Sequence, residues 1–324
     1  MPAMPEHVAD RIHAAITHSG SIACVGLDPR PALLPPDLRA AALSRHGNGP
    51  AAVAEAFLAF NRGLIDALAG ACAALKPQAA CYEAYGWHGM QALQETVAHA
   101  RARGIPVILD AKRGDIGSTA EHYRQAYLGA APGLAGALPP AYAADWLTIN
   151  GYLGSDGVTP FLDRPGAAHG VFVLVKTSNP SSGELQDLAL AGASGAGAVA
   201  GAGAGAETDS VMAAMARMVE RWGKERRGAC GLCDVGAVVG ATYPAQARRL
   251  RALMPDTLFL VPGYGAQGGS AEDALAGRRV DGDGVLVNSS RAIIAAWQQG
   301  GERDWAAAAR GALDTMNRDL NHLR

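Results

Sequence analysis

The chain has 324 residues, of which 49% are hydrophobic, so a large buried core can form. The 28 Lys and Arg residues nearly balance the 30 Asp and Glu residues, and a formal net charge of −2 gives no electrostatic case for nucleic acid or an anionic membrane as partner. No apolar stretch reaches the roughly 20 residues that span a bilayer. The lack of an apolar signal-peptide core and the five sparse cysteines favour a reducing, cytoplasmic location.

Short apolar runs recur along the chain, and most are followed by Gly, Asp or Asn and then by an Ala-rich stretch of helical length. Nearly continuous apolar character is typical of strands that are buried on both faces of a parallel sheet. Such strands with intervening helices predict a single α/β domain over residues 1–324, a (β/α)8 TIM barrel rather than an open doubly wound sheet. The predicted strands are Ser21–Leu27, Cys72–Lys76, Pro106–Asp110, Trp146–Asn150, Gly170–Lys176, Val235–Val239, Leu258–Val261 and Gly284–Asn288.

Helices are predicted between these strands, and two segments depart from the alternation. Residues 29–50 form a long connection that contains several prolines, and residues 189–206 are a low-complexity Ala/Gly insertion between the fifth and sixth strands. Composition alone does not separate an active-site lid from a spacer for this insertion. The predicted helices are Ala51–Ala69, His88–Arg103, Ser118–Leu128, Thr208–Arg226, Pro244–Met254 and Trp305–Leu320.

The run Asp110-Ala-Lys112-Arg-Gly-Asp115 follows the third strand directly. Positions 110 and 112 are two apart on a strand end, so their side chains are expected on the same side. Lys76 ends the apolar second strand, where a buried ammonium is costly unless it is paired, and Asp110 and Asp115 are its predicted partners. Because buried charge clusters stabilise folds poorly, this alternating Lys–Asp array indicates a catalytic site that handles a carbanion.

A barrel brings the carboxyl ends of its strands to one mouth, where barrel enzymes carry out catalysis. The Gly-rich segment 262–269 follows the seventh strand, and its backbone N–H groups can face an anion. Asn288-Ser-Ser-Arg291 begins a helix after the eighth strand, so the two segments together predict a phosphate site. The glycines of 262–269 also match G-x-G-x-x-G, but their place late in the chain excludes a dinucleotide fingerprint. The other polar residues at strand ends are Asp28, Asn150, Lys176, Ser178 and Asn179.

These motifs resemble those of the orotidine 5′-phosphate decarboxylase family, in particular its longer bacterial (type 2) subgroup. The resemblance covers residues 21 to about 295 and is most specific in Asp110-x-Lys112-x-x-Asp115-Ile116 with Thr119. The supporting motifs are Gly26-Leu-Asp28-Pro, Leu75-Lys76-Pro-Gln, Val175-Lys-Thr-Ser-Asn-Pro180, Gly265-Ala-Gln-Gly-Gly269 and Asn288-Ser-Ser-Arg291.

The resemblance implies decarboxylation of orotidine 5′-monophosphate (OMP) to UMP and carbon dioxide, the last step of de novo UMP biosynthesis. It also implies a homodimer that uses no metal and no organic cofactor. Lys112 would protonate C6 of the pyrimidine, Asp110 would face the substrate carboxylate, and Lys76 would bridge the carboxylate array and the ribose. The other implied roles are a ribose contact for Asp28, a pyrimidine contact for Ser178, phosphate contacts for Gln267 and Arg291, and a reach into the partner subunit's site for Asp115 and Thr119.

The sequence is compatible with three other interpretations. A metal-dependent sugar-phosphate decarboxylase or synthase of the same barrel superfamily shares Asp-x-Lys-x-x-Asp but requires Mg²⁺. A Schiff-base aldolase would use Lys76, Lys112 or Lys176, although a nucleophilic lysine needs a lowered pKa and flanking carboxylates act in the opposite direction. A catalytically silent barrel would bind a nucleotide and regulate a partner.

Overall fold

The fold is built on eight parallel strands, and all eight predicted strands are present. The computed structural model describes residues 7–162, 168–190, 209–265, 267–300 and 304–323. The barrel strands are β1 (Ala23–Leu27), β2 (Ala74–Pro77), β3 (Ile108–Arg113), β6 (Trp146–Ile149), β7 (Gly170–Lys176), β8 (Val235–Val239), β9 (Phe259–Val261) and β10 (Val285–Ser289). Every residue of β1, β6, β8 and β10 is buried, which explains their unbroken apolar character.

The strands pair in the order β2-β1-β10-β9-β8-β7-β6-β3. Between the two end strands of this sheet, Leu75 N donates to Pro106 O at 2.9 Å, and isolated parallel bridges join Leu75 to Val107 and Gln78 to Asp110. These contacts bring β2 beside β3, so the sheet curls into a nearly closed barrel. The prediction of a (β/α)8 TIM barrel is confirmed.

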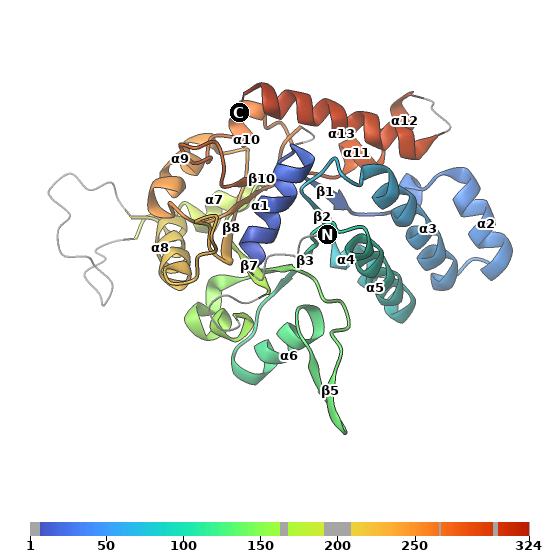
Figure 1. Cartoon of the computed structure of the whole chain (residues 1–324), viewed down its shortest axis with the longest axis horizontal. Coiled ribbons are helices and arrows are strands. Elements are labelled where there is room, and N and C mark those ends of the chain that lie inside the picture. The colour runs from blue at the N-terminus through green and yellow to red at the C-terminus, as the bar shows by residue number, and fades with distance from the viewer. Residues whose placement is uncertain (1–6, 163–167, 191–208, 266, 301–303, 324) are drawn as a thin grey trace, which may run out of the picture.

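Helices surround the barrel (Figure 1), and each predicted helix has a counterpart in the structure. The α-helices are α1 (Val8–Ser19), α2 (Pro36–His46), α3 (Pro50–Leu68), α4 (Ala79–Glu83), α5 (Gly86–Ala102), α6 (Gly117–Tyr127), α7 (Gly183–Gln186), α8 (Val211–Gly223), α9 (Pro244–Leu253), α10 (Ala271–Ala274), α11 (Arg291–Ile294), α12 (Trp297–Gly300) and α13 (Trp305–His322). The 3₁₀ helices are η1 (Pro31–Leu33), η2 (Gly151–Gly157), η3 (Thr159–Phe161) and η4 (Pro180–Ser182). In the described part of the chain, no helix combines the length and the apolar character that crossing a membrane requires.

The N-terminal end of the barrel is covered by α1, which lies across its centre in Figure 1. Its apolar side, including Ile12 and Ile16, is buried. Its polar side bonds to residues that precede strands, since Arg11 Nη2 donates to Asp145 Oδ1 at 2.8 Å and His13 Nδ1 lies 2.9 Å from Asp283 Oδ2. With this end covered, the carboxyl ends of the strands form the accessible mouth.

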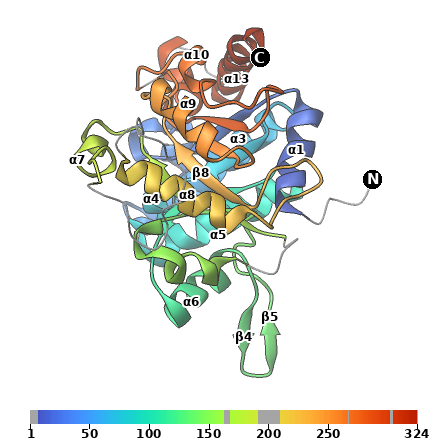
Figure 2. The same ribbon diagram turned by 90° about the vertical axis from the view of Figure 1, so that its left-hand side faces the viewer.

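Two features of the described chain differ from the sequence prediction. The connection 29–50 contains α2, which was missed because Ala42 is its one buried residue and its apolar periodicity is weak. Pro36 occupies the first helical position, where its missing N–H costs no hydrogen bond. A hairpin of β4 (Ala131–Gly133) and β5 (Gly136–Leu138) projects from the barrel (Figure 2), and its strands are too short to show alternation in the sequence.

The predicted Ala/Gly insertion at 189–206 falls mostly outside the described residues, which stop at 190 and resume at 209. At the described flanks, Ala189 forms an antiparallel bridge with Ser210, and Leu190 N donates to Asp209 O at 2.7 Å. The chain therefore leaves and rejoins the barrel at one place, between α7 and α8.

Candidate active site

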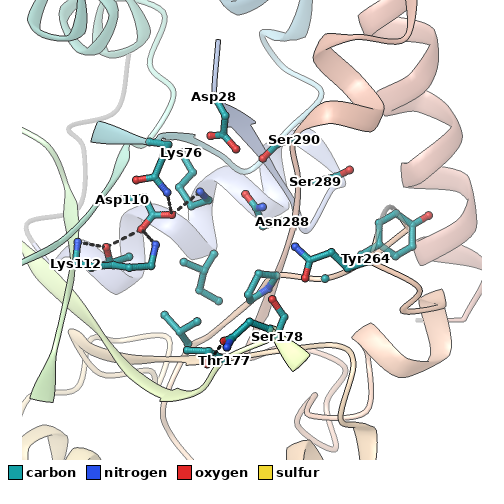
Figure 3. Close-up of a pocket in the computed structure, with 18 of the residues that line it drawn as sticks. Asp28, Lys76, Asp110, Lys112, Thr177, Ser178, Tyr264, Asn288, Ser289 and Ser290 are labelled. Carbon is teal, nitrogen blue, oxygen red and sulfur yellow. Dashed lines mark hydrogen bonds and ion pairs between the residues drawn. The ribbon is translucent and has the colours of Figure 1, made fainter. Parts of the chain in front are cut away.

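A cavity of about 750 Å³ lies at the carboxyl ends of the strands (Figure 3), within the ~300–1,000 Å³ typical of small-molecule sites. Residues from both halves of the chain line it, as expected for a barrel mouth. Seven predicted site residues are among them, namely Asp28, Lys76, Asp110, Lys112, Ser178, Gln267 and Arg291.

Asp110 is the centre of the polar network on one wall of the cavity. Its Oδ2 accepts hydrogen bonds from Lys76 Nζ at 2.7 Å and from Gln78 Nε2 at 3.1 Å. Its Oδ1 accepts from Lys112 Nζ at 2.6 Å and from Thr148 Oγ1 at 2.9 Å. Four donors on one buried carboxylate fix its orientation and leave it little freedom to rotate.

The charges of this network are mutually supporting. Burial alone would raise the pKa of Asp110, but Lys76 and Lys112 outweigh burial and hold that pKa well below its ordinary value. Burial alone would lower the pKa of Lys76, but Asp110 and Asp28 outweigh it and raise that pKa. Asp110 and Lys76 are therefore both charged at neutral pH. The Lys112 side chain is 47% exposed against 6% for Lys76, so Lys112 presents its ammonium to the open cavity.

Lys112 does not continue β3 as a regular strand. Its φ is 47°, in the left-handed region, and the pairing of β3 with β6 shifts register between Leu109 and Arg113. The prediction that the side chains at 110 and 112 meet is confirmed by the contact between Lys112 Nζ and Asp110 Oδ1. The meeting depends on this bulge rather than on simple strand alternation.

Two buried oxygens at the ends of neighbouring strands lack a hydrogen-bond partner among the described residues. Asp28 Oδ1 follows β1 and Asn288 Oδ1 belongs to β10, and both side chains line the cavity (Figure 3). Gly26 lets these strand ends approach, because a Cβ there would lie 1.8 Å from Ser290 Oγ. Buried acceptors are normally satisfied, so these two oxygens indicate a ligand that brings hydrogen-bond donors such as hydroxyl groups.

In the Gly-rich loop after β9, three backbone N–H groups bond to carbonyl groups of the loop itself. Gly265 N donates to Gly269 O and Gly268 N donates to Gly265 O, both at 2.8 Å, and Gly269 N donates to Gly263 O at 3.1 Å. These three N–H groups fold the loop, so they do not face an anion. The groups that the loop and α11 present to the cavity include the side chains of Gln267 and Arg291.

Ser178 lies in the loop after β7 and is held there by close packing. A Cβ at Gly240 would lie 2.8 Å from Ser178 Cα, so this glycine is required for the contact. Thr177 N donates to Gln186 Oε1 at 3.0 Å, and Gln186 Nε2 donates to Thr177 Oγ1 at 2.8 Å. The end of β7 and α7 therefore form one hydrogen-bonded unit that presents Ser178 to the cavity.

Lys176 and Lys76 do not have the surroundings of a Schiff-base nucleophile. Lys176 is fully buried, its Nζ lies 2.8 Å from both carboxylate oxygens of Asp187, and it sits 4.2 Å from the centre of the Tyr243 ring. The carboxylates around Lys76 raise its pKa, whereas a nucleophilic lysine needs a lowered pKa. These contacts argue against the aldolase interpretation.

Asp115 and Thr119 do not line the cavity in the described chain. The predicted ion pair between Asp115 and Lys76 is not present, because the chain turns away after the bulge and Asp115 Oδ1 accepts instead from Ile116 N at 2.8 Å. The four-charge array predicted from the sequence is therefore a three-charge array of Lys76, Asp110 and Lys112 within one chain.

Several lining residues were missed by the sequence analysis. Gln78 belongs to the Leu75-Lys76-Pro-Gln motif, so its position was a usable signal, whereas Thr148 sits inside an apolar strand and carried none. Asn150 was expected at the mouth, but its Oδ1 accepts from Tyr152 N at 3.0 Å and caps η2. Five further lining residues belong to segments that the sequence had singled out, namely Thr177, Tyr264, Asn288, Ser289 and Ser290, whereas Arg30, Ser182 and Gln186 were not predicted.

The chain resembles known proteins over almost its full length. A family model described as "Orotidine 5′-phosphate decarboxylase / HUMPS family" matches residues 23–302. An orotidine 5′-phosphate decarboxylase of Rhodopirellula baltica is 42% identical over 96% of this chain and 98% of its own, and one of Haloarcula marismortui is 41% identical over 98% and 100%. The solved structure of Leishmania donovani OMP decarboxylase covers 98% of each chain with 31% identity and a TM-score of 0.70.

These relatives are named for the decarboxylation of OMP, so the main interpretation of the sequence is supported and the sugar-phosphate alternative is not. Among the residues that the structure describes, no group of three or more His, Cys, Asp and Glu side chains could hold a metal ion. The chain belongs to the orotidine 5′-phosphate decarboxylase / HUMPS family.

Proposed function

We propose that the cavity at the barrel mouth converts OMP to UMP and carbon dioxide, with Asp110 beside the leaving carboxylate and Lys112 at C6 of the pyrimidine. The observation that carries this proposal is the carboxylate of Asp110 held between two ammonium groups, at 2.7 Å from Lys76 Nζ and 2.6 Å from Lys112 Nζ. The more exposed of these ammonium groups belongs to Lys112, which can reach a ring bound in the cavity.

The proposed chemistry starts with cleavage of the bond between C6 and the carboxyl carbon, which releases carbon dioxide and leaves the electron pair on C6. A fixed ammonium stabilises this localised charge without reorganisation, and Lys112 then gives its proton to C6. The neutral amine regains a proton from solvent before the next turnover. Asp110 holds the Lys112 ammonium through a hydrogen bond and places like charge next to the substrate carboxylate, whose departure relieves the repulsion.

The remaining lining residues fit the rest of the nucleotide. The buried Oδ1 atoms of Asp28 and Asn288, which lack a partner among the described residues, would accept hydrogen bonds from ribose hydroxyl groups. Ser178 would contact the pyrimidine edge, and the amide of Gln267 and the guanidinium of Arg291 would hold the phosphate. Binding energy from the phosphate, remote from C6, would then orient the ring for reaction.

We propose that the enzyme is a homodimer in which Asp115 and Thr119 reach the partner's cavity. Exposed apolar side chains lie near Asp115, because Ile116 follows it directly and is 53% exposed, and Leu153, next to Tyr152, is 48% exposed. A Cβ at Gly157 would lie 3.4 Å from Asp115 O and 2.9 Å from Leu153 Cβ, so the two residues are neighbours. Exposed apolar side chains beside the Asp115 carboxylate are suited to a face that packs against a second copy of the chain.

Mixing two inactive variants tests this dimer. If Asp115 acts in the partner's cavity, Asp115→Ala chains and Lys112→Ala chains should each be inactive as homodimers and should recover activity when unfolded and refolded together. Each heterodimer then contains one intact site, so random assortment should restore roughly a quarter of the parent's activity. Sedimentation analysis of the mixture checks the dimer, and a mixture that stays inactive while dimeric would place both residues in one chain's site.

A cytoplasmic location is part of the proposal. The five cysteines are free thiols in the structure. Burial raises the pKa of Cys72 and of Cys230 to about 12 and that of Cys233 to about 11, so these thiols resist deprotonation and oxidation. Unreactive, reduced thiols are typical of a protein that works in a reducing compartment.

The function is tested by adding OMP to purified protein in excess EDTA. We expect carbon dioxide and UMP to form in equal amounts, because the proposed chemistry uses protein side chains and needs no metal ion. The reaction is monitored by the loss of OMP absorbance. Activity that vanishes in EDTA and returns with Mg²⁺ on a sugar phosphate would instead indicate the metal-dependent class. Tight binding of UMP without any release of carbon dioxide would indicate a silent, nucleotide-binding barrel.

A further inference from the structure

The bulge that carries Lys112 needs an anchor that the regular sheet does not supply. In the left-handed conformation at φ 47°, an L-residue is strained, and such strain persists where the surroundings hold it. The ladder between β3 and β6 pairs Leu109 with Leu147, is interrupted, and resumes where Asn150 N donates to Arg113 O at 2.8 Å. Between these points, the backbone N–H of Lys112 has left the strand-to-strand pattern.

The hydroxyl of Thr148 takes the place of the missing ladder partner. Lys112 N donates to Thr148 Oγ1 at 2.9 Å, and Thr148 Oγ1 donates its single proton to Asp110 Oδ1 at 2.9 Å. The direction of both bonds is fixed, because an amide can only donate and a carboxylate can only accept. Thr148 is 1% exposed, so water does not compete for its hydroxyl.

This one hydroxyl therefore connects both ends of the Lys112 side chain. Through Lys112 N it holds the backbone from which the side chain starts, and through Asp110 Oδ1 it orients the oxygen that receives Lys112 Nζ at 2.6 Å. The β6 strand is the rigid neighbour of β3, so the connection runs from the barrel wall to the ammonium.

We propose that Thr148 is a positioning residue that holds the Lys112 ammonium in the place required for protonation of C6. The inference rests on the function proposed above and extends it to a residue on the neighbouring strand. Thr148 acts through Lys112 and Asp110, so its loss should affect the chemical step more than the binding of a nucleotide.

The alternative is that Thr148 merely fills space in the barrel wall. Thr148→Val keeps the shape of the side chain and removes the hydroxyl, whereas Thr148→Ser keeps the hydroxyl and removes the methyl group. Thr257→Val is the matched control, because Thr257 is also fully buried, precedes β9 at the opposite end of the barrel and lies 3.8 Å from Cys233 Sγ.

The experiment measures kcat and KM for OMP, the Kd for UMP and the thermal midpoint of the parent and the three variants. We expect Thr148→Val to lower kcat by roughly 10- to 100-fold, the effect of losing a hydrogen bond to a charged group, while the Kd for UMP changes less than about threefold. We expect Thr148→Ser to stay within about threefold of the parent in kcat, and Thr257→Val to match the parent.

Any of three results would overturn the inference in an active parent. The first is a Thr148→Val enzyme with the parent's kcat, and the second is a Thr148→Ser enzyme that is as impaired as Thr148→Val, which would assign the effect to side-chain volume. The third is a fall in kcat that is accompanied by a similar fold-loss of UMP affinity and by a lower thermal midpoint, which would indicate a structural role. A parent that does not turn over OMP would instead contradict the proposed function, so the two failures are distinguishable.

Discussion

Lys112→Ala is expected to lower kcat for OMP decarboxylation by on the order of 10⁴-fold or more, with the fold intact. The change removes a general acid, worth roughly 10²–10⁴-fold, together with the fixed positive charge that stabilises the carbanion. The Lys112 side chain is 47% exposed and contacts Asp110 at the cavity wall, so its loss leaves the barrel core untouched. Steady-state assays with OMP and circular dichroism of the same samples would measure the two effects separately.

The chain offers a matched lysine control. It has four lysines, of which three lie at the carboxyl ends of strands (Lys76 in β2, Lys112 in β3 and Lys176 in β7) and Lys224 lies exposed after α8. Lys224→Ala should therefore leave both activity and stability at the parent's values. A Lys112→Ala enzyme that turns over OMP at the parent's rate would contradict the assigned role, whatever its effect on substrate binding.

Asp110→Asn is expected to impair both stability and catalysis. Lys76 is 6% exposed, and removal of its carboxylate partner leaves a buried ammonium that is poorly compensated, which lowers the free energy of unfolding by ~3–5 kcal/mol. The amide of Asn has one acceptor oxygen in place of two, so it cannot accept from Lys76 and Lys112 through separate oxygens. Lys112 also loses its anionic partner, so kcat/KM should fall by on the order of 10³-fold. Urea denaturation and OMP assays on the same preparation would measure both changes.

A double variant separates the two losses at Asp110. Lys76→Met combined with Asp110→Leu replaces the buried pair by apolar groups of similar volume, which is often neutral or favourable for folding. We expect this double variant to regain most of the stability that Asp110→Asn loses and to stay inactive. Recovery of activity together with stability would mean that the pair serves the fold alone.

The pH dependence of stability follows from the same pair. The pKa of Asp110 is lower in the folded chain than its ordinary value near 4, so its contribution is fully present above about pH 4 and is lost as the pH falls toward the folded value. The pKa of Lys76 is raised, so its contribution is present below its ordinary value of about 10.4 and is lost only at a higher pH. Asp110→Asn should therefore lose less stability than the parent when both are acidified.

The barrel was predictable from sequence because its strands are short, apolar and regularly followed by helices. All eight strands and the seven cavity residues that include Lys76, Asp110 and Lys112 lie where the patterns indicated. Strand ends are predictable in this fold, because the topology brings every carboxyl end to one mouth.

The structural features that could not be predicted from the sequence depend on tertiary geometry or lack a periodic pattern. The left-handed turn at Lys112 is unusual for a lysine, and no local residue pattern marks it. The network from Thr148 to Asp110 joins positions 38 residues apart, and the internal hydrogen bonds of the Gly-rich loop depend on its closed shape. The hairpin of β4 and β5 and the weakly amphipathic α2 lack the periodicity on which a prediction can rest.

The central claim is that the ammonium of Lys112 delivers the proton to C6, and hydrogen exchange in the product tests it most directly. By microscopic reversibility, an enzyme that protonates C6 also removes that proton, so the parent in D₂O should replace the C6 hydrogen of UMP by deuterium, as followed by ¹H NMR. At a UMP concentration that saturates the enzyme, Lys112→Ala should show no exchange above the uncatalysed rate. Equal exchange by the two proteins would contradict the role of Lys112 as the proton donor.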